Sequence, residues 1–147
     1  MPNIVFHEGL PDIDELDSSN NNLIILDDLM QQVDQSILHL FTVDSHHKNI
    51  SVFFLTQNLF SSNKHNRTIS LNSHYLFLFN NPRDRSQINY LARQMFPTKS
   101  KFLIEVFEYV TSKEYGYLFL DFKQSTPNDN RVQTGIFPDE QRMIFQA

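Results

Sequence analysis

The sequence predicts an α/β fold with a mostly parallel sheet. Short apolar segments alternate with segments in which apolar residues recur at helical spacing, as in strand–helix–strand units. The clearest strand, at residues 23–26, is a run of four branched aliphatic residues. The run is too short to span a membrane and is typical of a strand buried on both faces of a parallel sheet. With 147 residues and no linker or repeat, the whole chain, residues 1–147, is expected to form one domain.

The remaining elements follow in order along the chain. Further strands are expected at 49–56, 75–79 and 115–122, with a short strand at 3–6 and an edge strand at 136–138. The third strand, at 75–79, is expected to be buried. Helices are expected at about 31–43, from Pro82 to the residue before Pro97, and after Thr98, which suits a helix cap. The polar segments 7–22, 61–66 and 123–132 are expected to be exposed loops.

The composition excludes several classes of protein. Hydrophobic residues make up 40% of the chain, which is a globular composition, and the formal net charge of −5 gives no basic footprint for nucleic acid. Contact with DNA would need a local patch or an assembled ring. The chain has no cysteine, which removes disulfides and cysteine-based zinc sites. No membrane span or signal peptide is recognisable.

Two carboxylates, Asp27 and Asp28, come directly after the first strand. Open α/β sheets bind their ligands at the carboxyl ends of the strands. Phosphoryl transfer uses one carboxylate there to hold Mg²⁺ and often a second to activate water, as in the Walker B strand of P-loop NTPases. Asp27 fits the metal role and Asp28 the role of water activation. The alternative is a strand end whose two exposed acids cap the next helix.

A neutral amide pair, Gln57 and Asn58, ends the second strand, and Gln57 lies 30 residues after Asp27. This spacing leaves room for one crossover helix between neighbouring parallel strands. An amide at this position can contact a γ-phosphate or orient water. The alternative is a turn in which Asn58 caps a helix.

Arginine and histidine side chains supply further candidates. Arg67 lies in a predicted loop after the second strand, where a neighbouring subunit could use it to stabilise transition-state charge. Arg83 and Arg85 fall in the predicted first turn of a helix, which disfavours cations. Each of these, like Arg93, has the alternative of an ordinary surface arginine. The adjacent pair His46–His47 suits a loop or a polar contact near a nucleotide better than a metal site.

One half of a nucleotide site is missing from the sequence. No G-x-x-x-x-G-K-[ST] loop is present to cradle phosphates. The chain has only three glycines, and none lies near another. The glycine count therefore agrees with the absence of such a loop.

These motifs, taken together, resemble the genome-packaging ATPases of Polinton/Maverick elements and adintoviruses. Those ATPases are relatives of the poxvirus DNA-packaging ATPase in the FtsK–HerA superfamily. The resemblance covers about residues 6–140. It is carried by LIILDDLM at 23–30, SHHKN at 45–49, FLTQNLF at 54–60, RTISLN at 67–72, FNNPRDRSQI at 79–88, LARQMFP at 91–97, GYLFLD at 116–121 and TGIFPDE at 134–140.

The resemblance implies a three-layer ASCE P-loop ATPase that binds Mg²⁺ and ATP and pumps double-stranded DNA into a capsid as a homo-oligomeric ring. It implies capsid or portal partners, no membrane, and a place in the host cytoplasm or nucleus or in the virion. Asp27 would hold Mg²⁺, Asp28 would be the catalytic acid, Gln57 the sensor with Asn58 beside it, and Arg67 a candidate arginine finger.

The family carries its phosphate-binding loop upstream of the position of Met1. The chain is therefore expected to be a C-terminal part of such an ATPase, incomplete at its N-terminal side and with little or no hydrolysis by itself. Two alternatives stay open. One is a non-catalytic interaction module of the same fold, and the other is an unrelated α/β domain whose paired acids are accidental.

Overall fold

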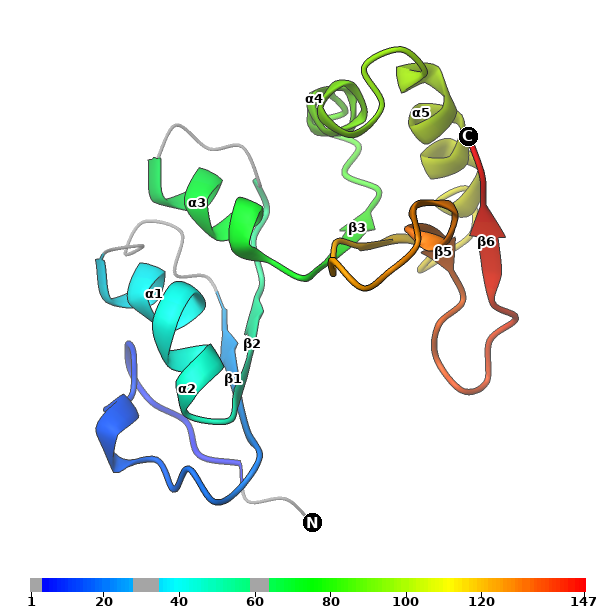
Figure 1. The fold of residues 1–147 in the computed structure, drawn as a ribbon. Helices are drawn as coiled ribbons and strands as arrows, with labels where there is room; N and C mark the ends of the chain where they lie inside the picture. The colour runs from blue at the N-terminus through cyan, green and yellow to red at the C-terminus, as the bar shows by residue number, and fades with distance from the viewer. Residues whose placement is uncertain (1–3, 28–34, 59–63) are drawn as a thin grey trace. The chain divides into compact units, whose positions relative to one another are not determined.

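The computed structural model describes residues 4–27, 35–58 and 64–147 (Figure 1). The chain divides into two compact units, Met1–Asn72 and Ser73–Ala147, and each has its own sheet. The α/β class predicted from the sequence is confirmed. The expectation of one domain over the whole chain stays a prediction. Among the described residues, no helix combines the length and apolarity needed to cross a bilayer.

The first unit is built on two parallel strands, β1 (Asn22–Leu26) and β2 (Ile50–Phe54), paired from Asn22↔Ile50 to Leu26↔Phe54. The helical connection between them is the crossover that the sequence predicts. It comprises α1 (Gln35–His39), the π-helix η2 (Leu40–Asp44) and α2 (Ser45–His47). The unit also contains the short 3₁₀ helix η1 (Ile13–Glu15) and α3 (Lys64–Asn72).

The helices of the first unit pack on one face of its sheet (Figure 1). The buried core on that face joins strand and helix residues: Ile24, Leu26, Ile37, Leu40, Ile50 and Ile69. On the opposite face Leu23, Ile25 and Phe53 are each more than half exposed. The expectation that the first strand is buried on both faces is therefore wrong for this structure, because successive side chains of a strand point to opposite faces and only one face is covered.

The second unit is built on four antiparallel strands in the order β3-β4-β5-β6. They are β3 (Tyr75–Phe79), β4 (Tyr117–Asp121), β5 (Val132–Thr134) and β6 (Met143–Phe145). Two helices, α4 (Ser86–Met95) and α5 (Ser100–Val110), separate β3 from β4, and the 3₁₀ helix η3 (Asn128–Asn130) precedes β5. This sheet does not fit the expected mostly parallel arrangement.

Strands β3 and β4 carry two different kinds of side chain on their two faces. The register pairs Phe77 with Phe119 and Phe79 with Tyr117, and their rings lie 4.9 and 6.0 Å apart. The alternate residues are leucines, and Leu118 and Leu120 of β4 are fully buried. One face is therefore aromatic and the other aliphatic.

Several local expectations for the second unit need correction. The strand at 75–79 exists, but it is not buried, since Tyr75 is 43% and Phe79 61% exposed at the edge of the sheet. The residues at 136–138 are not a strand, and β5 and β6 lie on either side of them. In the first unit, residues 4–6 are exposed and not in a strand.

The boundaries of the two helices also differ from the expectation. Helix α4 begins at Ser86, not at Pro82, because the Asp84 carboxylate accepts hydrogen bonds from the Ser86 backbone N–H (2.9 Å) and hydroxyl (2.6 Å). These bonds hold the pKa of Asp84 below its usual value. The helix ends before Pro97, as expected. Thr98 does not cap α5, whose cap position is Lys99 without a side-chain hydrogen bond.

Candidate functional site

The candidate site lies at the carboxyl ends of β1 and β2. The two strands are parallel neighbours, and the Leu55 N–H donates to the Leu26 carbonyl oxygen at 2.9 Å, which extends their pairing to the strand ends. Asp27 is the next residue after Leu26, and its side chain is exposed. Asp27 therefore lies at the same end of the sheet as Gln57, which follows β2, as the sequence spacing predicts.

A tight turn fixes the chain after β2. The Asn58 backbone N–H donates to the Thr56 hydroxyl at 3.3 Å, and the same hydroxyl donates to the Asn58 carbonyl oxygen at 3.2 Å. Such hydroxyl-to-backbone bonds replace the strand ladder where a strand ends. The turn leaves Gln57 exposed and Asn58 half-buried. The alternative interpretation, in which Asn58 lies in a turn, is therefore confirmed for the backbone. A turn at this position does not exclude a role for the Gln57 amide.

The other two candidate residues are Asp28 and Arg67. Asp28 lies outside the described residues. Arg67 is exposed on α3, not in the expected loop. The helix was missed because its sequence is polar overall and has one fully apolar buried position, Ile69. The role of Arg67 as an arginine finger stays a prediction.

The other arginines occupy exposed positions in the second unit. Arg83 is in a turn, Arg85 occupies the cap position of α4, and Arg93 is in the last turn of that helix. A cation in the last turn of a helix interacts favourably with the helix dipole, so Arg93 has a structural explanation.

The histidine pair lies at the other edge of the first unit's sheet. His47 is exposed at the end of α2, and β2 begins three residues later at Ile50. Asp27 and Gln57 follow the opposite ends of the strands, roughly 16 Å away for a five-residue strand. The expectation that His46–His47 lies near a nucleotide at Asp27 is therefore wrong for this structure.

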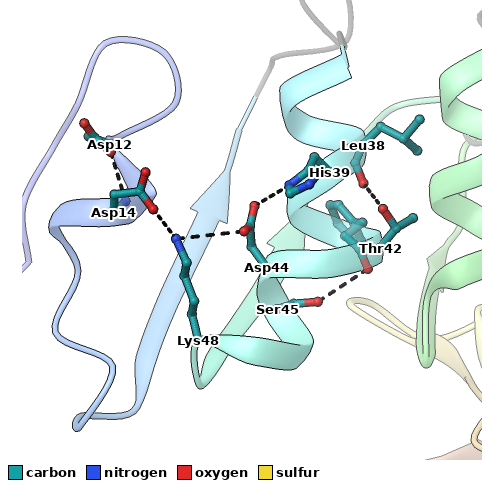
Figure 2. A network of polar contacts seen from close by, with 9 residues as sticks. Asp12, Asp14, Leu38, His39, Thr42, Asp44, Ser45 and Lys48 are labelled. Atoms are coloured by element: carbon teal, nitrogen blue, oxygen red, sulfur yellow. Dashed lines mark hydrogen bonds and ion pairs between the residues drawn. The ribbon is translucent and has the colours of Figure 1, made fainter.

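A polar network that the sequence reasoning missed ties the N-terminal segment to the crossover helix (Figure 2). The Lys48 ammonium contacts the Asp14 carboxylate and lies 4.0 Å from Asp44, and His39 Nδ1 lies 2.9 Å from Asp44 Oδ2. The π-helix brings His39 and Asp44 into reach because its hydrogen-bond pattern joins residues five apart. The pairing with Lys48 lowers the pKa of Asp14 and raises that of Lys48.

The spacing of Asp44 and Lys48 was a usable signal for part of this network, since residues four apart on a helix are neighbours. Asp14 gave no such signal, because it lies far from Lys48 in the sequence. The acidic segment was expected to be only a solvated surface. Instead, Leu10, Ile13 and Leu16 of the same segment pack against the core of the first unit. The network therefore has a structural role, which is to hold this segment in place.

The donor set at the strand ends is compatible with Mg²⁺ bound together with a nucleotide. Among the residues the structure describes, no group of three or more histidines and carboxylates is placed to hold a metal ion. Magnesium with a nucleotide needs only one or two carboxylates, because phosphates and water complete its coordination. The exposed carboxylate of Asp27, which follows the strand next to the one that Gln57 follows, meets that requirement.

Two clefts lie within the separate units, and neither is lined by Asp27 or Gln57. One, of about 470 Å³, lies in the first unit between the N-terminal segment and α1, with Asp12, Asp14, His39 and Asp44 on its wall. The other, of about 530 Å³, lies between α4 and α5 and has Ile88 and Phe107 beside Arg85 and Glu108.

No protein-family model, curated protein or solved structure matches the chain. The candidate site therefore depends on its own geometry and on the motifs of the sequence.

Proposed function

We propose that this chain forms part of a nucleotide-hydrolysing site of the kind used by DNA-packaging ATPases of the FtsK–HerA superfamily. One observation carries the proposal. Asp27 and Gln57 follow the carboxyl ends of two adjacent parallel strands, which is the edge at which open α/β sheets bind ligands. The resemblance in sequence motifs supplies the class of reaction.

The proposal assigns a role to each residue. Asp27 holds Mg²⁺, usually through water in such sites, and Asp28 positions or deprotonates the attacking water. Gln57 reads the γ-phosphate, with Asn58 beside it in the turn. Arg67 is the candidate for the arginine that acts on a neighbouring subunit's site. Bound Mg·ATP would supply the phosphoric anhydride bond whose cleavage drives the motor.

The site is proposed to need a phosphate-binding loop that this sequence does not contain. Two features of the first unit support an incomplete sheet. Parallel sheets normally have both faces covered, yet the face of β1 and β2 that carries Leu23, Ile25 and Phe53 is exposed. The described residues of the first unit also form only two strands, and a two-stranded sheet is marginal by itself. A further strand bearing the loop, and the layer behind it, would complete the three-layer P-loop architecture.

The wider setting comes from the resemblance alone. It comprises a homo-oligomeric ring, double-stranded DNA as the cargo, capsid or portal partners, and an intracellular or virion-associated location. The net charge of −5 places any DNA contact in a local patch or in the assembled ring.

A second candidate is a non-catalytic interaction module of the same fold. The exposed apolar face of β1 and β2 favours it, since contiguous apolar surface marks sites of association. In that case Asp27 and Gln57 would bind no nucleotide.

Calorimetric titration of Mg·ATP into the purified chain tests the proposal. We expect weak binding, with Kd of roughly 1 mM, and no measurable hydrolysis. The binding should be lost in Asp27→Ala and retained in Asp139→Ala, a matched change at an exposed acid of the second unit. Equal binding by all three proteins would contradict the assignment of Asp27. No binding by any of them would favour the interaction module.

A further inference from the structure

Strand β3 forms an outer edge of the antiparallel sheet. Among the described residues it pairs with β4 alone. Its five residues, YLFLF, include no charged residue, proline or glycine. Tyr75 and Phe79 expose about half of their surface, at 43% and 61%. An exposed, apolar edge of this kind is a template for pairing with another strand.

The hydrogen bonds of β3 show which backbone groups face that edge. The Phe122 N–H donates to the His74 carbonyl oxygen at 2.8 Å, so the backbone of His74 points toward β4. In an antiparallel pair the N–H and C=O of one residue point the same way, and the direction alternates along the strand. The backbone groups of Tyr75, Phe77 and Phe79 therefore point away from β4, toward the open edge.

The other outer strand of the same sheet is protected. Strand β6 has only three residues, and Arg142 precedes it. Short strands and neighbouring charges are the usual means by which proteins prevent edge-to-edge pairing. Strand β3 has five residues, and no lysine, arginine, aspartate or glutamate adjoins it in the sequence. The Lys123 ammonium lies 5.0 Å from the centre of the Tyr75 ring, at one end of the strand, and leaves Phe77 and Phe79 without a charged neighbour in the sequence. The two edges of the sheet therefore differ in their capacity to associate.

We propose that β3 pairs antiparallel with β3 of a second copy of this chain, about a two-fold axis at Phe77. The pattern of aromatic and aliphatic residues in YLFLF reads the same in both directions. Pairing about Phe77 sets Tyr75 opposite Phe79 of the second copy and Phe77 opposite its counterpart. Aromatic side chains then meet aromatic side chains on one face, and leucines meet leucines on the other, which is the self-complementarity of a closed dimer.

The backbone and the charges fit the same arrangement. The three residues whose N–H and C=O groups face the open edge are those that oppose one another, so the pair forms about six interchain hydrogen bonds. Beyond the strand ends, His74 lies opposite Asn80 and Ser73 opposite Asn81. No like charges oppose each other along the contact.

Sedimentation of the intact chain over a wide range of protein concentration tests the proposal. We expect an equilibrium between a single chain and a species of twice its mass. Phe79→Lys places a charge on an exposed side chain of the edge and should shift the equilibrium to the single chain. Ile144→Lys, the same change on exposed Ile144 of β6, should leave the dimer unchanged.

Two results would overturn the proposal. If the protein sediments as a single chain at every concentration, β3 does not pair with a second copy, and its open edge would suit a strand of another polypeptide. A dimer that survives Phe79→Lys would place the contact elsewhere.

Cysteine cross-linking locates the axis independently, because the chain has no native cysteine. Directly opposed residues that exchange hydrogen bonds have Cα atoms about 5.5 Å apart, which a disulfide spans. Under mild oxidation Phe77→Cys should form a covalent dimer, whereas Ile144→Cys should not. If Phe77→Cys does not fold, Tyr75→Cys combined with Phe79→Cys tests the same register. Equal cross-linking of the Phe77 and Ile144 variants would contradict the proposed axis.

Discussion

The two units of this chain each combine a sheet with helices but arrange their strands differently. In the first unit β1 and β2 are parallel, and one helical run from Gln35 to His47 connects them. In the second unit β3 and β4 are antiparallel, and two helices, α4 and α5, connect them. In the first unit the helical run returns the chain to the end of the sheet at which β1 began, so the next strand runs in the same direction. In the second unit the second helix carries the chain back to the end of the sheet at which β3 finished, so β4 runs antiparallel to β3.

This difference determines where each unit can place polar groups. Parallel neighbours bring both of their carboxyl ends to the same end of the sheet, so Asp27 and Gln57 both follow strands that finish there. Antiparallel neighbours put their carboxyl ends at opposite edges. The second unit instead gathers aromatic side chains on one face of its sheet. The first unit is accordingly the one in which we place the candidate site.

The largest expected effects come from truncating the two cores. Leu40 of the first unit and Leu103 of the second are fully buried, and replacing either by alanine should cost about 2–5 kcal/mol. Hydrogen exchange should show faster exchange mainly in residues 4–72 for Leu40→Ala and mainly in residues 73–147 for Leu103→Ala. If each variant loosens both units equally, the chain is one cooperative domain, as the sequence analysis expects.

Two glycines with positive φ give the next contrast. Gly9 of the first unit has φ of 80°, and a Cβ added there would meet no atom within 4 Å. Gly135 has φ of 67°, and a Cβ added there would lie 2.1 Å from the Gln141 carbonyl oxygen. Gly9→Ala should cost about 1 kcal/mol from backbone strain alone. Gly135→Ala should cost clearly more, because the loop before β6 must also move. Equal shifts of the urea midpoint would show that this loop gives way freely.

A smaller effect concerns the buried hydroxyl of Tyr117. It donates to the Glu140 carboxylate and accepts from the Ile136 backbone N–H at 2.9 Å. Tyr117→Phe should cost about 1–2 kcal/mol, measured by urea unfolding at neutral pH. A variant as stable as the native chain would mean that water replaces both bonds.

The same hydroxyl predicts a pH dependence. Burial and the Glu140 carboxylate raise the pKa of Tyr117. The folded state therefore holds this proton more tightly than the unfolded state. The associated stability is complete below the ordinary tyrosine pKa of about 10 and is lost as the pH rises through the raised value. Alkaline unfolding curves should lose this component in Tyr117→Phe, and an unchanged alkaline profile would contradict the assignment.

The smallest effect is expected at the Asp14–Lys48 pair of the first unit. Both groups contact solvent, so Asp14→Asn should lower the unfolding midpoint only slightly, and salt should reduce the difference. Lys48 lowers the pKa of Asp14. The contribution is therefore present above the ordinary aspartate pKa and is lost as the pH falls through the lowered value. A salt-independent loss would point to packing instead of charge.

The sequence predicted the positions of strands and helices better than it predicted the direction of the strands or the burial of the sheet faces. The strand at 75–79 has the bounds that were expected, because its apolar run is sharply limited by polar residues. Its exposure could not be read from the same run, since apolarity does not say whether a covering layer is present. The two helices between 75–79 and 115–122 were recognised, and counting them would have indicated an antiparallel pair.

At the candidate site, too, some features were predicted from the sequence and others were missed. Spacing predicted correctly that Asp27 and Gln57 follow adjacent parallel strands, because one crossover helix fits between them. Helix α3, which carries Arg67, was missed because few of its residues are apolar. The Asp14–Lys48 contact depends on how the N-terminal segment folds onto the rest of the first unit. The local sequence around either residue does not predict it.

Paramagnetic mapping with Mn²⁺ in place of Mg²⁺ tests the central assignment most directly. The amide signals of Asp27, Gln57 and Asn58 should broaden first when Mn²⁺ and ATP are added together, and Asp27→Asn should abolish the effect. Signals of Asp12 and Asp14, which belong to an exposed acidic segment, serve as the internal control. Broadening centred on the two strand ends would support a nucleotide-bound metal at Asp27. Broadening that follows exposed carboxylates in general, or that leaves Gln57 unaffected, would contradict it.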